Sequence, residues 1–178
     1  LATVLDDIDL SETALHLGRG LAAPALYALL DEFRSERGIN PANLRGSIGF
    51  DPVAALAAGP SPEPKQTFAL AEQLTEATEG APHFQSVTVD ARPYHDAGAS
   101  AVEEVAATLS ALTERLARST ERGAPLPTLL DNLQVRVPIS TSYFVEIGKL
   151  RALRLLVPQV IAAFADEVET EIDFGPVD

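Results

Sequence analysis

The residues best suited to chemistry lie together in one segment, residues 90–98, which reads DARPYHDAG. Its polar members include Arg92, Tyr94, His95 and Asp96. An imidazole beside a carboxylate can act as a general base, with the carboxylate orienting the ring. The segment follows a predicted strand, and enzymes built on parallel strands place their sites at that end. The competing interpretation is a loop whose polar side chains bond one another and cap the next helix.

Two further candidate sites use the same kinds of side chain. Asp90, His95 and Asp96 offer two carboxylates and one imidazole, which can hold a divalent ion, but neither of the other two histidines has ligand spacing with this group. Arg19 and Arg92 are the candidate substrate-binding residues. Arg19 stands between two glycines whose backbone N–H groups would suit a phosphate. A tight turn explains the same glycines without any ligand.

Strands and helices alternate along the chain that must position these residues. Apolar or alternating runs predict strands over residues 13–17, 45–50, 84–90 and 134–139. Apolar stripes predict helices over residues 21–37, 63–78, 100–121 and 142–157, with a helical continuation beyond Pro158. The alternation predicts an α/β fold of parallel strands with crossover helices, either a doubly wound sheet or a (β/α) barrel.

Two details of these helices are also predicted. Ser100 and Glu103 form a capping box that opens the third helix. The polar side of the fourth helix is expected to carry four charged residues: Glu146, Lys149, Arg151 and Arg154.

Composition excludes several classes of protein. The 178 residues carry a formal net charge of −13, which argues against nucleic acid and anionic membranes as partners. There is no cysteine, and therefore no disulfide, zinc–thiolate site or thiol nucleophile. We see no apolar run long enough to span a membrane and no signal peptide, so we expect a cytoplasmic protein. The absence of methionine suggests a trimmed chain.

Three stretches resemble the methylmalonyl-coenzyme A mutase family. They are RGSIGFDP at residues 45–52, VDARPYHDAGASAVEEVAATLSAL at residues 89–112 and SYFVEIGKLRALRLL at residues 142–156. The resemblance implies a (β/α)8 TIM barrel that binds acyl-coenzyme A along its axis, beside a separate cobalamin-binding domain. It also implies interconversion of methylmalonyl-CoA and succinyl-CoA by a radical route. In the bacterial two-chain form, a catalytic large subunit pairs with a similar small subunit that lacks cofactor and active-site residues.

The departures from the family pattern favour the small subunit. Aligned on Ala97-Gly98, the catalytic tyrosine and histidine of the family fall on Arg92 and Pro93. A glutamine that contacts substrate becomes Gly49. The cobalamin motif Asp-x-His-x-x-Gly is also absent, because Pro93 stands where its aspartate should be.

The resemblance leads to a specific set of expectations. Residues 1–166 form part of a TIM barrel and residues 167–178 an acidic tail. The chain is a structural partner of the catalytic subunit, has no catalytic residue and holds no cofactor, while the partner chain holds adenosylcobalamin. Exposed barrel edges should drive pairing with the large subunit or self-association. Two alternatives remain: an acyl-CoA-binding isomerase that uses Tyr94 and His95 in a shifted register, or a non-enzymatic assembly module.

Overall fold

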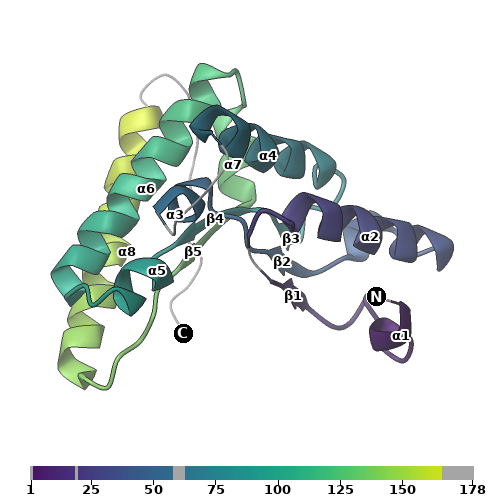
Figure 1. The fold of residues 1–178 in the computed structure, drawn as a ribbon, viewed down its shortest axis with the longest axis horizontal. Helices are drawn as coiled ribbons and strands as arrows, with labels where there is room; N and C mark the ends of the chain where they lie inside the picture. Colours follow the sequence, from purple (N-terminus) through teal and green to yellow (C-terminus); the bar gives the residue numbers. More distant parts are fainter. Residues whose placement is uncertain (1, 19, 58–62, 166–178) are drawn as a thin grey trace.

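The computed structural model describes residues 2–18, 20–57 and 63–165 (Figure 1). The strands are β1 (Leu15–Leu17), β2 (Gly46–Ile48), β3 (Phe84–Gln85), β4 (Val87–Asp90) and β5 (Leu133–Arg136). The helices are α1 (Ala2–Leu5), α2 (Ala23–Glu36), α3 (Pro52–Ala57), α4 (Pro64–Ala77), α5 (Arg92–Asp96), α6 (Ala101–Glu121), α7 (Leu126–Asp131) and α8 (Tyr143–Ala165), with a 3-10 turn at Pro41–Asn43. The predicted acidic tail and Arg19 lie outside the described residues.

All strand pairs are parallel, as the alternation of elements predicts. One sheet has the order β1-β2-β3 and a second pairs β4 with β5. Neighbouring strands therefore follow one another in chain order, joined by the helices α2, α4 and α6. The α/β class is confirmed, whereas the two sheets are not closed into a barrel.

The predicted strand over residues 84–90 is divided at Ser86. Phe84 and Val87 are both fully buried against helices, although residues three apart in a regular strand point to opposite faces. The extra residue, Ser86, accepts a 2.7 Å hydrogen bond from the Thr78 hydroxyl. This break turns β4 away from β2 and toward β5, so the single predicted strand takes part in both sheets.

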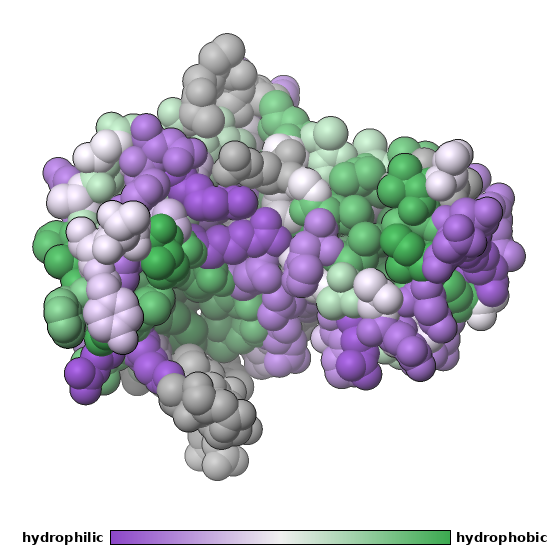
Figure 2. Space-filling model, turned by 90° about the horizontal axis from the view of Figure 1, so that it is seen from below, coloured by the Kyte–Doolittle hydropathy of each residue, from purple (hydrophilic) through white to green (hydrophobic). Residues whose placement is uncertain are grey.

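Each sheet has its own apolar core on the side of its helices. Leu15, Leu17, Ile48 and Phe84 pack with α2 and α4. Val87, Val89, Leu133 and Val135 pack with α6, α7 and α8. Because side chains alternate along a strand, the intervening polar residues lie on the opposite face. Seen from below, hydrophilic side chains run across the middle of the molecule between two apolar regions (Figure 2).

The predicted capping box is confirmed at the start of α6. The Ser100 hydroxyl accepts from the Glu103 N–H, and the Glu103 carboxylate accepts from the Ser100 N–H at 2.7 Å. The predicted helical continuation beyond Pro158 is confirmed, whereas the prediction for the charged side of the last helix changes. It continues through Pro158 as one element, and Glu146 and Lys149 are buried rather than on its exposed side. Among the described residues, no helix is both long and apolar enough to cross a membrane.

Candidate functional site

The segment after β4 forms a short helix, α5, at the C-terminal end of the strand. Arg92 folds back onto Asp90, the last residue of β4, with Nε 2.8 Å from Oδ1 and Nη2 2.6 Å from Oδ2. Asp90 is buried, and its hydrogen bonds raise the pKa of Arg92 above the ordinary value. The guanidinium is therefore engaged in an internal ion pair and also holds the start of α5 against the strand.

His95 turns toward α6 rather than toward its neighbour Asp96. Its Nδ1 lies 2.7 Å from Oε1 of Glu104, a residue buried on α6. Asp96 is exposed. The expectation of an aspartate orienting this imidazole is therefore wrong, because the helical turn of α5 carries the two side chains in different directions. Sequence reasoning missed Glu104, although its place beside the capping box positions it next to α5.

Glu104 belongs to a buried charge cluster that joins α5, α6 and α8. Lys149 Nζ lies 2.7 Å from carboxylate oxygens of both Glu104 and Glu146, and 2.7 Å from the carbonyl oxygen of Pro138. The Ser140 hydroxyl donates to Glu146 at 2.6 Å. We call Glu104, Glu146, Lys149 and His95 the charge cluster. It ties the loop after β5 to the loop after β4.

The pKa shifts in the charge cluster follow from these contacts. Burial alone would raise the pKa of Glu104, but hydrogen bonds from Lys149 and His95 outweigh it, and the pKa is lowered. Burial likewise opposes the charge on Lys149, yet the two carboxylates raise its pKa. The hydrogen bonds from Lys149 and Ser140 lower the pKa of Glu146 to about 2. The three groups are ionised at neutral pH and stabilise one another.

The metal alternative is not supported by the positions of its three residues. Asp90 is paired with Arg92, His95 contacts Glu104, and Asp96 is exposed. Within residues 2–18, 20–57 and 63–165, no three His, Asp or Glu side chains are placed to hold a metal ion.

Three carboxylates, of Asp51, Asp90 and Asp96, border a hollow of about 370 Å³ at the C-terminal ends of β2 and β4. Asp51 is buried, and burial raises its pKa. Its oxygens accept from the N–H groups of Val53 at 2.8 Å and Asp90 at 2.7 Å. Asp51 therefore caps α3 and links it to β4. Tyr94 is half-buried on this side, where burial and the charges of Asp51 and Asp90 raise its pKa.

The polar face of the strands carries a hydrogen-bonded row that the sequence analysis did not single out. Arg136 Nη2 donates to the Ser47 hydroxyl at 2.7 Å, and Ser47 also bonds His16 at 2.8 Å. Arg136 Nε donates to Gln134, whose amide donates to Gln85 at 3.0 Å. The row links β1, β2, β3 and β5. The alternation of polar residues in LQVR was the available signal.

Gly49 provides the space that Arg136 occupies. A Cβ added at Gly49 would lie 2.4 Å from Nη1 of Arg136, closer than a real contact allows. The position where the resemblance expects a substrate-contacting glutamine is therefore filled from β5. Beside it, a hollow of about 430 Å³ is lined by His16, Leu17, Gly18, Arg92, Gln134 and Arg136.

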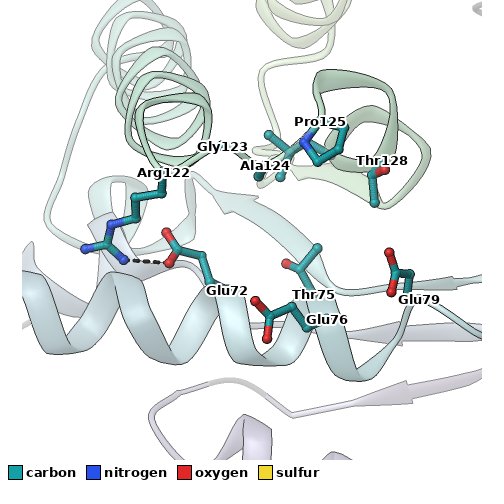
Figure 3. Close-up of a pocket in the computed structure, with 10 residues that line it drawn as sticks. Glu72, Thr75, Glu76, Glu79, Arg122, Gly123, Ala124, Pro125 and Thr128 are labelled. Atoms are coloured by element: carbon teal, nitrogen blue, oxygen red, sulfur yellow. Dashed lines mark hydrogen bonds and ion pairs between the residues drawn. The ribbon is translucent and has the colours of Figure 1, made fainter.

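A separate pocket of about 220 Å³ lies between α4 and the turn after α6 (Figure 3). Glu72 and Glu76 face it from α4 and Glu79 from the turn that follows this helix, and Arg122 Nη1 is paired with Glu72 at 2.6 Å. The three carboxylates outnumber the one guanidinium, so the pocket repels polyphosphate ligands. Its position at the C-terminal end of α4 separates it from the α5 segment.

The family model of methylmalonyl-CoA mutase matches residues 1–173 of this chain. The methylmalonyl-CoA mutase small subunit of Streptomyces virginiae is 34% identical to this chain over 150 residues, which cover 84% of this chain and 24% of that protein. The small subunit of Propionibacterium freudenreichii subsp. shermanii is 33% identical over 159 residues, covering 86% of this chain and 24% of that protein.

A large subunit is also similar to this chain. The probable methylmalonyl-CoA mutase large subunit of Mycobacterium bovis is 27% identical to this chain over 166 residues, which cover 91% of this chain and 22% of that protein. The chain thus spans about a quarter of the length of the relatives it matches. Since the family model matches nearly all of the sequence, the chain belongs to the methylmalonyl-CoA mutase family.

Proposed function

We propose that this chain is the barrel part of a mutase small subunit and acts as a structural partner of the catalytic, cobalamin-dependent chain. The barrel assignment is supported by the strand order, in which parallel neighbours follow the chain without a reversal. A doubly wound sheet has a point where the strand order reverses, whereas a (β/α) barrel adds each strand beside the previous one.

The non-catalytic role rests on the internal pairing of the candidate residues. Arg92 stands where the family has its tyrosine and is paired with Asp90, while His95 is displaced from the histidine position and contacts Glu104. A catalytic group misplaced by even about 1 Å loses a large part of its effect. These side chains instead hold α5 against β4 and α6. This pairing is the observation that carries the proposal.

The family's cofactor, adenosylcobalamin, does not fit the described residues well. A cobalt-ligating imidazole must face an open site, but His95 faces α6, and the nearby hollow is bordered by Pro93 and Asp96 instead. Pro93 replaces the aspartate of the cobalamin motif. We therefore assign no step of the radical reaction to this chain and place the cofactor on its partner.

Complex formation with a catalytic chain tests the structural role. The purified chain is mixed with the Mycobacterium bovis large subunit and analysed by sedimentation velocity, with the M. bovis small subunit as the positive control. We expect a stable complex in both mixtures. If the control pairs and this chain sediments alone, the partner role is wrong.

One observation favours the alternative of an acyl-CoA-binding barrel. The hollow beside Gly49 is lined by three nitrogen donors: His16 of β1, Arg136 of β5 and Arg92 at the start of α5. Guanidinium groups suit the carboxylates and phosphates of an acyl-CoA. Against this alternative, Arg92 is bound to Asp90, and Arg136 is bound to Ser47 and Gln134.

A further inference from the structure

In the first half of α8, apolar side chains are exposed and charged side chains are buried, which is the reverse of an ordinary surface helix. Its charged residues Glu146 and Lys149 are 6% and 4% exposed, whereas Phe144 is 84% exposed. The other large exposed apolar residues of the helix are Tyr143, Val145, Ile147, Leu150 and Leu155. Monomeric proteins seldom expose a contiguous apolar patch of this kind unless something binds it. We call these six residues, from Tyr143 to Leu155, the apolar face of α8.

The charge cluster fixes this orientation of the helix. Turning α8 to bury Phe144 would withdraw Lys149 from Glu104 and from the carbonyl oxygen of Pro138. Separating a buried ion pair without replacing its partners is strongly unfavourable. The exposure of the apolar face is therefore a consequence of well-formed buried contacts rather than of loose packing.

The surface next to this face is hollowed. A groove of about 330 Å³ runs between the starts of α6 and α8, the two helices side by side in Figure 1. Its lining includes Val102, Val105, Val145, Gly148 and Ala152. A Cβ added at Gly148 would meet no atom within 4 Å. The groove can accept an apolar side chain from another molecule without any rearrangement of α6 or α8.

The charges on α8 indicate what kind of surface covers it. Arg151 and Arg154 are exposed on this helix, in a chain whose net charge is −13. Glu146 is the only acidic residue of α8, and it is buried. A twofold contact joins the same patch of both copies, so a contact centred on this face would bring together the arginines of both copies with no exposed carboxylate from either α8. The exposed cations therefore favour a different protein, one with carboxylates around an apolar centre.

Building on the proposed function, we propose that the apolar face of α8 is the surface by which this chain docks on the catalytic large subunit. Phe144 and Leu155 are the apolar anchors, and the groove beside Gly148 receives a side chain of the partner. Arg151 and Arg154 pair with carboxylates of the large subunit. The charge cluster is the internal support that holds this face outward.

The test compares variants in their binding to the M. bovis large subunit, measured by sedimentation velocity. The double variant Phe144→Ser/Leu155→Ser is expected to weaken binding by about tenfold or more, and Arg151→Glu/Arg154→Glu to weaken it and reverse its salt dependence. Leu29→Ser, at a residue 54% exposed on α2, is the matched control and should bind like the unaltered chain. Circular dichroism verifies that each variant is folded.

The contrary outcomes separate this inference from the proposed function. If both α8 variants bind as tightly as the unaltered chain, the docking face is wrong and the partner role stands. If the unaltered chain does not bind while the M. bovis small subunit does, both proposals fall. If the chain self-associates and Phe144→Ser/Leu155→Ser abolishes that association, a second copy is the occupant and the inference is overturned.

Discussion

At the scale of single residues, Lys149 joins α8 to α6 through buried ion pairs. Its ammonium group is fully buried and contacts two carboxylates and a carbonyl oxygen. Removing one member of a buried ion pair leaves the other charges uncompensated. We predict that Lys149→Met lowers the free energy of unfolding by about 3 kcal/mol in urea titrations. Lys65→Met, at an exposed position of α4, is the control and should change it little; equal effects would contradict the structural role of the charge cluster.

The lowered pKa of Glu146 predicts a specific acid sensitivity. Its ordinary value is 4.5 and its value in the folded chain is about 2, so the folded state holds this proton less tightly than the unfolded chain. The carboxylate therefore stabilises the fold fully above pH 4.5, and this contribution is lost as the pH falls toward about 2. Urea titrations between about pH 6 and pH 3 should show a shallower loss of stability for Glu146→Gln than for the unaltered chain. Identical pH dependence would show that Glu146 is not the responsible group.

Gly49 and Arg136 are expected to be energetically coupled. A glutamine at position 49 must displace the Arg136 guanidinium and its 2.7 Å hydrogen bond to Ser47. We predict that Gly49→Gln destabilises the chain by about 1 kcal/mol, and that this cost nearly disappears in an Arg136→Ala background. The double-mutant cycle measures the coupling directly. Additive effects would mean that the two residues do not share this space.

At the scale of elements, the start of α6 depends on its capping box. Ser100 and Glu103 satisfy each other's backbone N–H groups at the N-terminus of this 21-residue helix. We predict that Ser100→Ala costs about 1 kcal/mol of stability in thermal melts. Ser110→Ala, at an exposed position inside the same helix, should have no measurable cost, because alanine is the best helix former. A similar loss in both variants would contradict the capping role.

Local sequence patterns predicted those elements whose formation depends mainly on their own residues. The capping box and the helix over residues 100–121 follow from spacing that one segment carries alone, and the parallel strands follow from the alternation of strands and helices along the chain. The buried face of α6 was not predicted: Val102 of the apolar stripe is 78% exposed, whereas Glu104 and Arg115 are buried. The division at Ser86 did not, because it depends on which of β2 and β5 pairs with each half of residues 84–90. The burial of Glu146 and Lys149 was also missed, because their partner Glu104 lies on another helix.

The site residues divide in the same way, between those visible in a local motif and those whose role depends on contacts between distant segments. Position 92 and Gly49 could be identified from the family pattern, because a departure from a motif is visible in sequence. Arg136 could not be connected with Gly49, because the two residues are brought together only by the pairing of strands. His95 was identified as the notable imidazole, but its partner Glu104 was not.

At the scale of the whole molecule, the net charge of −13 and the apolar face of α8 together determine which partners the surface favours. The acidic surface discourages anionic ligands, while α8 presents apolar side chains with two arginines. Since the chain spans about a quarter of its relatives' length, the activity of those proteins is not assigned to it. In this account, the candidate catalytic side chains are internal supports and α8 is the contact surface.

Ligand titration of the chain alone tests this account most directly. Adenosylcobalamin is followed by its visible spectrum and succinyl-CoA by isothermal titration calorimetry, with the M. bovis large subunit as the positive control for both. We predict no saturable binding of either ligand to this chain, because Arg92, His95 and Arg136 are engaged by Asp90, Glu104, Ser47 and Gln134. Saturable binding of either ligand, abolished by Arg136→Ala, would contradict the structural role and favour the acyl-CoA-binding alternative.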